Sequence, residues 1–266
     1  MLLDKKNAVV YGAAGAIGRT VARAFAREGA RVFLAGRTRA TLDALADEIV
    51  AAGGDADAAV VDALDERAVR RHADTVAETA GSLDVSLNAI GVDHVQGTPL
   101  TELSPQDFSL PIATYTTTQF LTATAAARHM VRQGGGIILT MSTTAARVTM
   151  PTDGFGPACA AVEALSLQLA GEVGPHGVRV VCLRPDGIAE SAALGSHTRA
   201  VWTRAAARAG ITLDQALEAP GAPGAMLPRP LALADVAETA AFLASDRAAA
   251  LTATVANISR GSIVDY

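Results

Sequence analysis

The chain has 266 residues, enough for one domain with a full hydrophobic core. Half of the residues are apolar and only 4% are aromatic, which favours helices packed on a sheet over an all-β fold. A net charge of -5 without a basic cluster argues against a nucleic-acid partner. No apolar run approaches the roughly 18 residues of a membrane span, and no signal peptide is recognisable. We therefore expect a cytoplasmic protein without a membrane partner.

Strand and helix patterns alternate along the chain. Short apolar runs predict strands, and apolar residues at helical spacing predict helices. Strands are expected at 7–11, 31–35, 58–61, 84–89, 137–141, 178–183 and 254–258, and helices at 16–28, 41–52, 66–80, 113–132, 156–173 and 233–244. Parallel strands need crossover helices, so this order predicts an α/β fold with a doubly wound, seven-stranded parallel sheet. Residues 1–266 are expected to form one domain, with a helical insertion or lid at about 189–230.

A glycine-rich turn follows the first predicted strand. Gly12, Gly15 and Gly18 are three residues apart, and Ile17 begins the apolar stripe of the next helix. Glycines let a backbone turn tightly and approach a pyrophosphate, whose charge is stabilised at a helix N-terminus. Between a first strand and a long helix, this pattern predicts a dinucleotide site.

The end of the second predicted strand bears on the choice of dinucleotide. An NAD site places an acidic residue there, but this strand ends in Gly36 and Arg37. Arg37 is suited to a 2'-phosphate, and the alternative is a solvated arginine at a helix start. The prediction is NADP(H) rather than NAD(H).

Further motifs resemble the short-chain dehydrogenase/reductase family over essentially the whole chain. Asn88-Ala89-Ile90-Gly91 is similar to the family's Asn-Asn-Ala-Gly, and residues 137–142 to the strand that ends in the catalytic serine. The resemblance implies a Rossmann-type fold, a small-molecule substrate, and a homodimer or homotetramer formed through helices 113–132 and 155–173. It also implies cofactor contacts from six residues: Asp62, Ala63, Asn88, Gly91, Pro185 and Ile188.

The catalytic positions depart from the family pattern. The family uses Asn, Ser, Tyr and Lys, and the matching positions here are Tyr115, Ser142, Phe155 and Cys159. Ser142 precedes Phe155 by the family's usual thirteen residues. A phenyl ring has no proton to exchange, and a thiol supplies no fixed positive charge. The usual proton transfer is therefore expected to be lost, and only the serine remains.

Several side chains are candidates to replace it. Tyr115 brings a phenol from the neighbouring helix, although it is equally consistent with a buried spacer bonded to backbone. Asp93 and His94 follow Gly91 and suit an acid/base pair, with a solvated loop histidine as the alternative. Asp153 fits a turn better than the cleft, and Cys159 fits an inert buried thiol better than a nucleophile.

Three functions remain open from the sequence. The first is an NADP(H)-dependent oxidoreductase acting on a small carbonyl, alcohol or enone through a rearranged acid/base group. The second is a redox-neutral cyclase, isomerase or dehydratase that keeps the nucleotide as a structural part. The third is a non-catalytic subunit of the same fold. The pattern predicts no metal site.

Overall fold

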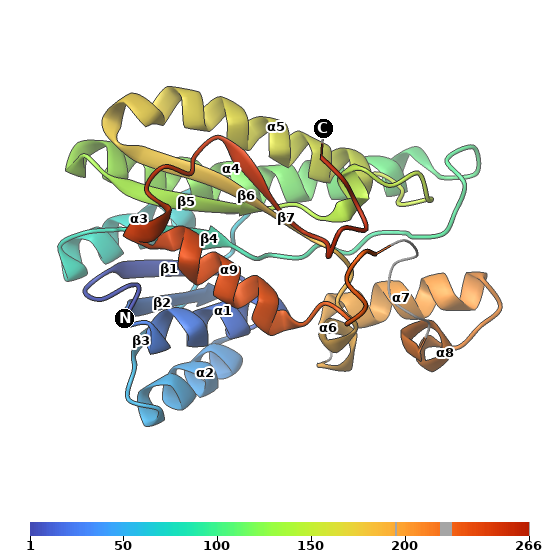
Figure 1. The fold of residues 1–266 in the computed structure, drawn as a ribbon, viewed down its shortest axis with the longest axis horizontal. Coiled ribbons are helices and arrows are strands. Elements are labelled where there is room, and N and C mark those ends of the chain that lie inside the picture. Colours follow the sequence, from blue (N-terminus) through green and yellow to red (C-terminus); the bar gives the residue numbers. More distant parts are fainter. Residues whose placement is uncertain (195, 219–224, 266) are drawn as a thin grey trace.

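One all-parallel sheet of seven strands organises the molecule, in the order β3-β2-β1-β4-β5-β6-β7 (Figure 1). The computed structural model describes residues 1–194, 196–218 and 225–265. The strands are β1 (Asn7–Tyr11), β2 (Arg31–Gly36), β3 (Asp55–Val60), β4 (Val85–Asn88), β5 (Gly136–Met141), β6 (Val178–Pro185) and β7 (Thr254–Ile258). The predicted doubly wound, seven-stranded parallel sheet is confirmed.

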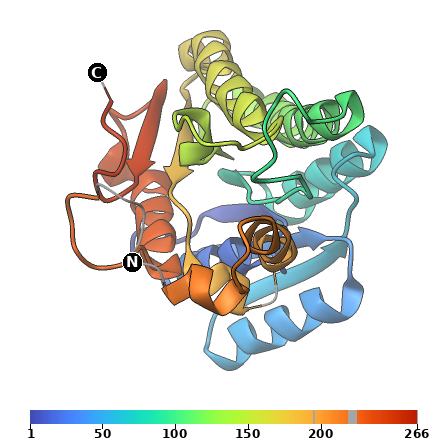
Figure 2. The same ribbon diagram turned by 90° about the vertical axis from the view of Figure 1, so that its right-hand side faces the viewer.

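Helices cover both faces of the sheet (Figures 1 and 2). One face carries α1 (Ala16–Arg27), α2 (Arg39–Ala51) and α9 (Leu233–Ala244). The other carries α3 (Glu66–Ala80), α4 (Pro105–Gln133) and α5 (Phe155–Val173). The strands alternate between the two cores: Val10 packs toward α1, whereas Val9 packs toward α3 and α4. Strands buried on both faces explain the nearly continuous apolar runs in the sequence.

Three further helices form a lobe where β6 ends, on the right of Figure 1. They are α6 (Ala189–Ala193), α7 (His197–Arg208) and α8 (Leu213–Glu218), all within the predicted insertion at 189–230. Residues 195 and 219–224 of that insertion lie outside the described residues. Short 3-10 helices lie at η1 (Thr144–Ala146), η2 (Gly174–His176) and η3 (Asp246–Ala248). The lobe therefore stands beside the carboxyl ends of the strands, where ligands bind in folds of this class.

Two element boundaries differ from the predictions by three residues or more. α4 begins at Pro105 rather than 113, because the Ser104 hydroxyl caps it by accepting the Asp107 N–H at 3.0 Å. Pro111 lies inside this helix. Because proline lacks an N–H and usually interrupts helices, the sequence did not predict the turns that precede it. β3 begins at Asp55 rather than 58. It is an edge strand, and its acidic side chains face solvent, where Asp57 pairs with Arg31.

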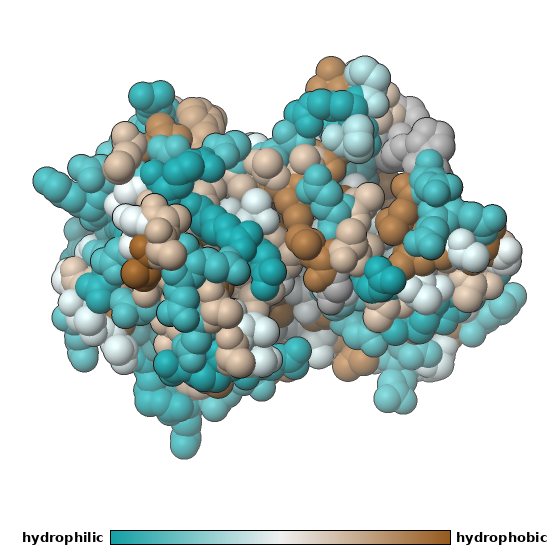
Figure 3. All heavy atoms as spheres, turned by 90° about the horizontal axis from the view of Figure 1, so that it is seen from below, coloured by the Kyte–Doolittle hydropathy of each residue, from teal (hydrophilic) through white to brown (hydrophobic). Residues whose placement is uncertain are grey.

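The surface in Figure 3 carries both hydrophilic and apolar side chains. Viewed from below, hydrophilic side chains cover most of the face, and apolar groups appear between the main body and the α7–α8 side (Figure 3). Among the described residues, none of the helices has both the length and the apolarity required to span a bilayer.

Candidate functional site

The glycine turn after β1 has the shape that a pyrophosphate requires. Gly12 has a φ of +74°, and a Cβ added there would stand 2.9 Å from the Ala89 carbonyl carbon and the Ile90 nitrogen. A Cβ at Gly18 would meet the Gly12 oxygen at 2.2 Å. The Gly15 N–H donates to the Gly12 oxygen at 3.0 Å, and α1 starts directly afterwards without a side-chain cap. Bare backbone at a helix N-terminus fits a dinucleotide phosphate, while half-buried Ile17 packs into the core behind it.

The residues predicted to hold the adenosine half follow β2 and β3, which are neighbours in the sheet. Arg37 follows β2 directly and is exposed, so its guanidinium is free to reach a ligand at this edge. Asp62 follows β3, and its carboxylate accepts the Leu64 N–H at 3.0 Å, while Ala63 is buried. The parallel register therefore brings Arg37 and Asp62 to the same edge as the glycine turn.

Asn88 and Gly91 lie beyond the end of β4. The Asn88 side chain is buried, donating to the Thr122 hydroxyl at 2.9 Å and accepting the Ile90 N–H at 2.9 Å, so it shapes the loop. Gly91 is exposed, but the lobe lies close beside it: a Cβ there would stand only 1.8 Å from Cε1 of His197, the first residue of α7. The imidazole of His197 thus packs directly on the loop that was predicted to touch a cofactor.

Tyr115 is buried and its hydroxyl is already occupied. The phenol is 2% exposed and donates a hydrogen bond to the Met141 carbonyl at 2.7 Å. Burial raises its pKa well above the usual value. Of the two interpretations of this residue, the structure shows the spacer bonded to backbone. Its proton is not directed at a substrate.

Ser142 and Thr143 directly follow β5 and contact side chains one turn apart on α5. Ser142 is fully buried, and its hydroxyl donates to Glu163 at 2.8 Å on the neighbouring helix α5. The next hydroxyl, that of Thr143, lies 3.5 Å from the Cys159 sulfur. Both hydroxyls therefore contact α5, and a shift of one residue along the chain decides which of them lies beside Cys159 and which beside Glu163. The thirteen-residue interval selected Ser142, whereas the geometry favours Thr143.

Cys159 is a buried thiol on α5. Its side chain is fully buried, and burial raises its pKa to about 12. A thiol with such a pKa stays protonated at neutral pH and is a poor nucleophile. The second cysteine, Cys182, is also buried and free. The interpretation of Cys159 as an inert filler agrees with this environment.

His94 stacks on Phe155. Their ring centroids are 4.2 Å apart and the rings lie within 9° of parallel. Asp153 holds this pair together, because its carboxylate accepts the N–H groups of Val95 and Phe155, each at 2.6 Å. Asp153 has a φ of +54° and forms the turn that the sequence favoured for it. Burial raises its pKa to about 6.

The two members of the predicted acid/base pair have different environments. The Nδ1 atom of His94 lies 3.2 Å from the Val92 carbonyl, and burial lowers the pKa of the imidazole to about 4. Asp93 instead is exposed and forms an ion pair with Arg204 of α7. Asp93 therefore links this loop to the lobe. Its Oδ1 atom also accepts the backbone N–H of His94 at 3.1 Å, which is a contact to the main chain and not to the imidazole.

The loop after β6 also lies at the carboxyl ends of the strands, beside the candidate site. Pro185 ends the strand and is buried, and Ile188 is 3% exposed in a cluster with Ala16 at the start of α1. This contact brings the loop beside the glycine turn. The described residues show no group of three or more side chains suited to a metal ion.

Comparison with known proteins identifies the family. A family model described as enoyl-(acyl carrier protein) reductase matches residues 12–262. A solved short-chain type dehydrogenase/reductase from Mycobacterium ulcerans is 28% identical, with a TM-score of 0.83 over 98% of this chain and 91% of that chain. The chain belongs to the short-chain dehydrogenase/reductase family.

Two curated members of the short-chain dehydrogenase/reductase family illustrate the similarity. D-threitol dehydrogenase of Mycolicibacterium smegmatis is 36% identical over 189 residues, which is 69% of this chain and 70% of that protein. The L-rhamnose 1-dehydrogenase (NAD(P)(+)) of Azotobacter vinelandii is 34% identical over 196 residues, covering 71% and 75% of the two chains.

The sequence did not predict one buried ion pair close to the candidate site. Arg184 is fully buried beside Glu163, with its Nη1 atom 3.3 Å from the carboxylate, and it also pairs with Asp265 near the C-terminus. An arginine directly before Pro185 in an otherwise apolar run, and a glutamate in the middle of an alanine-rich helix, were the available signals. Buried charges are almost always paired, so the two residues required each other.

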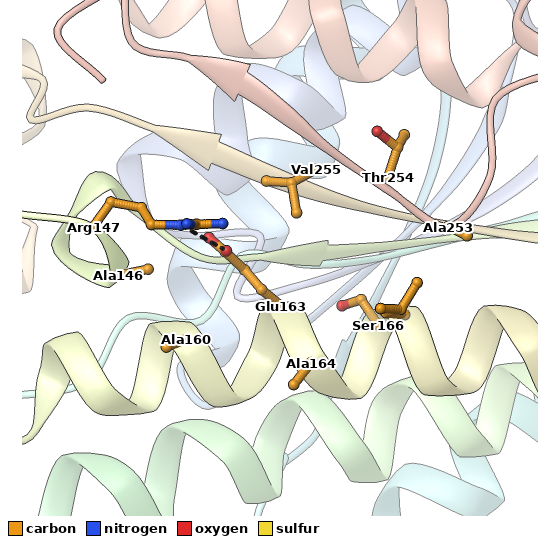
Figure 4. A pocket seen from close by; sticks show the side chains of 10 residues that line it. Ala146, Arg147, Ala160, Glu163, Ala164, Ser166, Ala253, Thr254 and Val255 are labelled. Atoms are coloured by element: carbon orange, nitrogen blue, oxygen red, sulfur yellow. Dashed lines mark ion pairs between the residues drawn. The ribbon is translucent and has the colours of Figure 1, made fainter. Parts of the chain in front are cut away.

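A surface hollow is lined in part by Glu163, the partner of Arg184. It holds about 440 Å³ between α5 and β7, where Arg147 faces Glu163 at 3.8 Å (Figure 4). Its lining contains neither the glycine turn nor His94, Thr143 or Phe155. The hollow is therefore separate from the candidate site.

Proposed function

We propose that this protein is an NADP(H)-dependent oxidoreductase acting on a small alcohol, carbonyl or enone. When an alcohol is oxidised, its hydride passes to the nicotinamide and its hydroxyl proton passes to His94. Membership of the short-chain dehydrogenase/reductase family and the shape of the glycine turn support the dinucleotide. When bound, the nicotinamide supplies or accepts the hydride. The remaining chemistry falls to side chains of this chain.

The stacking of His94 on Phe155 carries the proposal. In this proposal Phe155 and Cys159 stand at the family's tyrosine and lysine positions, so the imidazole lies directly against the position where the phenol would be. With the Nδ1 hydrogen donated to the Val92 carbonyl at 3.2 Å, Nε2 keeps a lone pair. A pKa lowered to about 4 keeps this ring neutral near pH 7 and able to accept a proton from an alcohol.

Thr143 supplies the second polar group of the proposed site. Its hydroxyl lies 3.5 Å from the sulfur of Cys159. Cys159 is one helical turn after Phe155 on α5. We assign to it the role of donating a hydrogen bond to the substrate oxygen. Tyr115 and Ser142 have no such role in this arrangement, since each donates its hydroxyl proton to another part of the protein.

The matched test of the proton carrier compares two histidine variants. His94→Gln should lower kcat at least about 100-fold, the usual scale of general acid–base catalysis, while the dissociation constant for NADPH changes less than about twofold. His129→Gln is the control, because that imidazole pairs with Asp74 on the α3–α4 surface. A panel of ketones, enones and alcohols is assayed by nicotinamide absorbance. An unchanged kcat in His94→Gln would remove His94 from the mechanism.

The preference for NADP(H) is tested at Arg37. This exposed arginine follows β2, and the strand end provides no carboxylate for a ribose hydroxyl. Arg37→Ala should weaken NADPH binding about tenfold and leave NADH binding unchanged, measured by calorimetric titration. The adjacent Arg39→Ala is the control, because Arg39 already pairs with Asp43. Tighter NADH than NADPH binding in the unaltered protein would contradict the preference.

A second candidate is a redox-neutral reaction in the same pocket. The observation that favours it is the close packing of His197 on Gly91, which closes the lobe over the loop beside the proposed site. A neutral His94 also moves protons without any change of oxidation state. Conversion of a substrate without a change in nicotinamide absorbance would support this candidate, and stoichiometric NADPH consumption would exclude it.

A further inference from the structure

Asp186, in the loop after β6, joins three segments of the chain through one carboxylate. Its Oδ1 atom accepts the Thr144 hydroxyl at 2.9 Å and the Gly187 N–H at 2.8 Å. Its Oδ2 atom accepts the Ser262 hydroxyl at 2.8 Å. We call these four residues the Asp186 junction. Hydrogen bonds to a charged acceptor are stronger than neutral ones, so three on one carboxylate hold the loop firmly.

The partners of Asp186 belong to parts that are themselves fixed. Thr144 directly follows Thr143, whose hydroxyl is the one beside Cys159. Ser262 lies in the C-terminal segment, which Asp265 anchors to the buried Arg184. The Asp186 N–H adds a backbone bond to the Ile258 oxygen at 3.2 Å, at the end of β7. The junction thus ties the loop to the end of β5 on one side and to the C-terminal segment on the other.

The opposite side of the loop faces the lobe and the glycine turn. A Cβ added at Gly187 would meet the Trp202 ring of α7 at 3.3 Å. Ile188 clusters with Ala16 at the start of α1. The loop therefore spans the space between the glycine turn and the Thr143 hydroxyl, and charge-assisted hydrogen bonds hold its Asp186 side.

We propose that Asp186 is a positioning residue that holds this loop in the shape that binds the nicotinamide half of the dinucleotide. The inference rests on the proposed function. Without the carboxylate, the loop would have to become ordered when the nicotinamide half binds, and the free energy of that ordering would weaken the binding. The adenosine half is met by separate elements, at the glycine turn, Arg37 and Asp62, and its binding should not depend on the junction.

The test compares a whole dinucleotide with a fragment of it. Calorimetric titrations use NADPH and adenosine 2',5'-bisphosphate, which lacks the nicotinamide half. Asp186→Ala should weaken NADPH binding about tenfold and change the dissociation constant of the fragment less than about twofold. Ser262→Ala and Thr144→Val each remove one donor and should give smaller losses in the same direction. Asp186→Asn, which keeps Oδ1 as an acceptor, should restore part of the affinity.

Asp84→Ala is the matched control. The Asp84 carboxylate also accepts a backbone N–H, that of Asn7 at 2.7 Å, and a serine hydroxyl, that of Ser82 at 2.8 Å. Asp84 directly precedes β4, so it lies at the amino-terminal ends of the strands, away from the candidate site. It should lower the melting temperature and leave the ratio of the two affinities unchanged. Equal weakening of both ligands by Asp186→Ala, or the same change of ratio in Asp84→Ala, would overturn the inference. Failure of the unaltered protein to bind either ligand would instead overturn the proposed function, and this role with it.

Discussion

Burial sets the protonation of the histidines at the level of single residues. His72 is buried and His94 is partly buried, and this burial lowers the pKa of each imidazole to about 4. His94 is thereby a base rather than an acid at neutral pH. Alcohol oxidation should keep its rate from about pH 8 down to about pH 5 and fall below that, with an apparent pKa of about 4. A rate that falls near pH 6.5 in a pH–rate profile would mean that His94 is solvated.

The same groups predict how stability depends on pH. Between about pH 4 and 6 the unfolded chain protonates His94 and His72 while the folded protein does not, so stability is full at higher pH and lost as pH falls. Asp153, with its pKa raised to about 6, acts in the opposite direction and cancels one of these two protons. His197, whose pKa burial also lowers, adds to the loss.

We therefore expect a net loss of about 2 kcal/mol in the free energy of unfolding between pH 6 and pH 4 from His94, His72 and Asp153, to which His197 adds. Urea titrations at the two pH values measure it. The His72→Leu variant should show a smaller loss than the unaltered protein, since it removes one of the titrating groups. A greater stability at pH 4 than at pH 6 would contradict the buried, neutral state of these rings.

At the scale of elements, the turn between β1 and α1 depends on the absence of side chains. Gly18→Ala would place a methyl group 2.2 Å from the Gly12 oxygen and push α1 away from the turn. We expect a loss of about 2 kcal/mol or more in stability and at least about tenfold weaker NADPH binding. Melting curves and calorimetric titration check both.

Gly53→Ala is the control for that substitution. Gly53 has a φ of +86°, but nothing lies within 4 Å of an added Cβ. The expected cost is about 1 kcal/mol from backbone strain alone, with NADPH binding unchanged. Equal effects of the two substitutions on NADPH binding would contradict the close approach at Gly18.

Element boundaries also decided which hydroxyl enters the candidate site. Counting residues selected Ser142, but β5 ends so that Ser142 turns toward Glu163 on α5 and Thr143 toward Cys159. Both residues follow the last residue of β5 and both contact α5, so an interval in the sequence fixes the region and not the side chain. Tyr115 shows the same limit: its position on α4 was predicted, but not that its hydroxyl would be bonded to Met141.

At the scale of the whole molecule, exposed apolar side chains on the α4–α5 layer suggest where copies of the chain meet. Phe120 of α4 is 50% exposed and Leu167 of α5 is 60% exposed, and the two helices pack side by side. The homodimer or homotetramer expected from the family should use this layer.

The double variant Phe120→Glu/Leu167→Glu should shift the protein to monomers in sedimentation velocity, because charges would be buried in the interface. Val50→Glu is the control, since Val50 is 56% exposed on α2, on the other face of the sheet. A protein that sediments as a monomer without any substitution, at micromolar concentration, would contradict the expected assembly.

By itself, the sequence determined the parallel sheet, the succession of strands and helices along the chain, and the glycine turn, because apolar periodicity and glycine spacing are local properties. It also indicated that Phe155 and Cys159 lack the expected proton chemistry. Only the tertiary structure decided the partners of each polar group: His94 on Phe155, Ser142 with Glu163, and Asp186 with Thr144 and Ser262. These contacts join residues that are far apart in the chain, and burial rather than spacing determines which of them form.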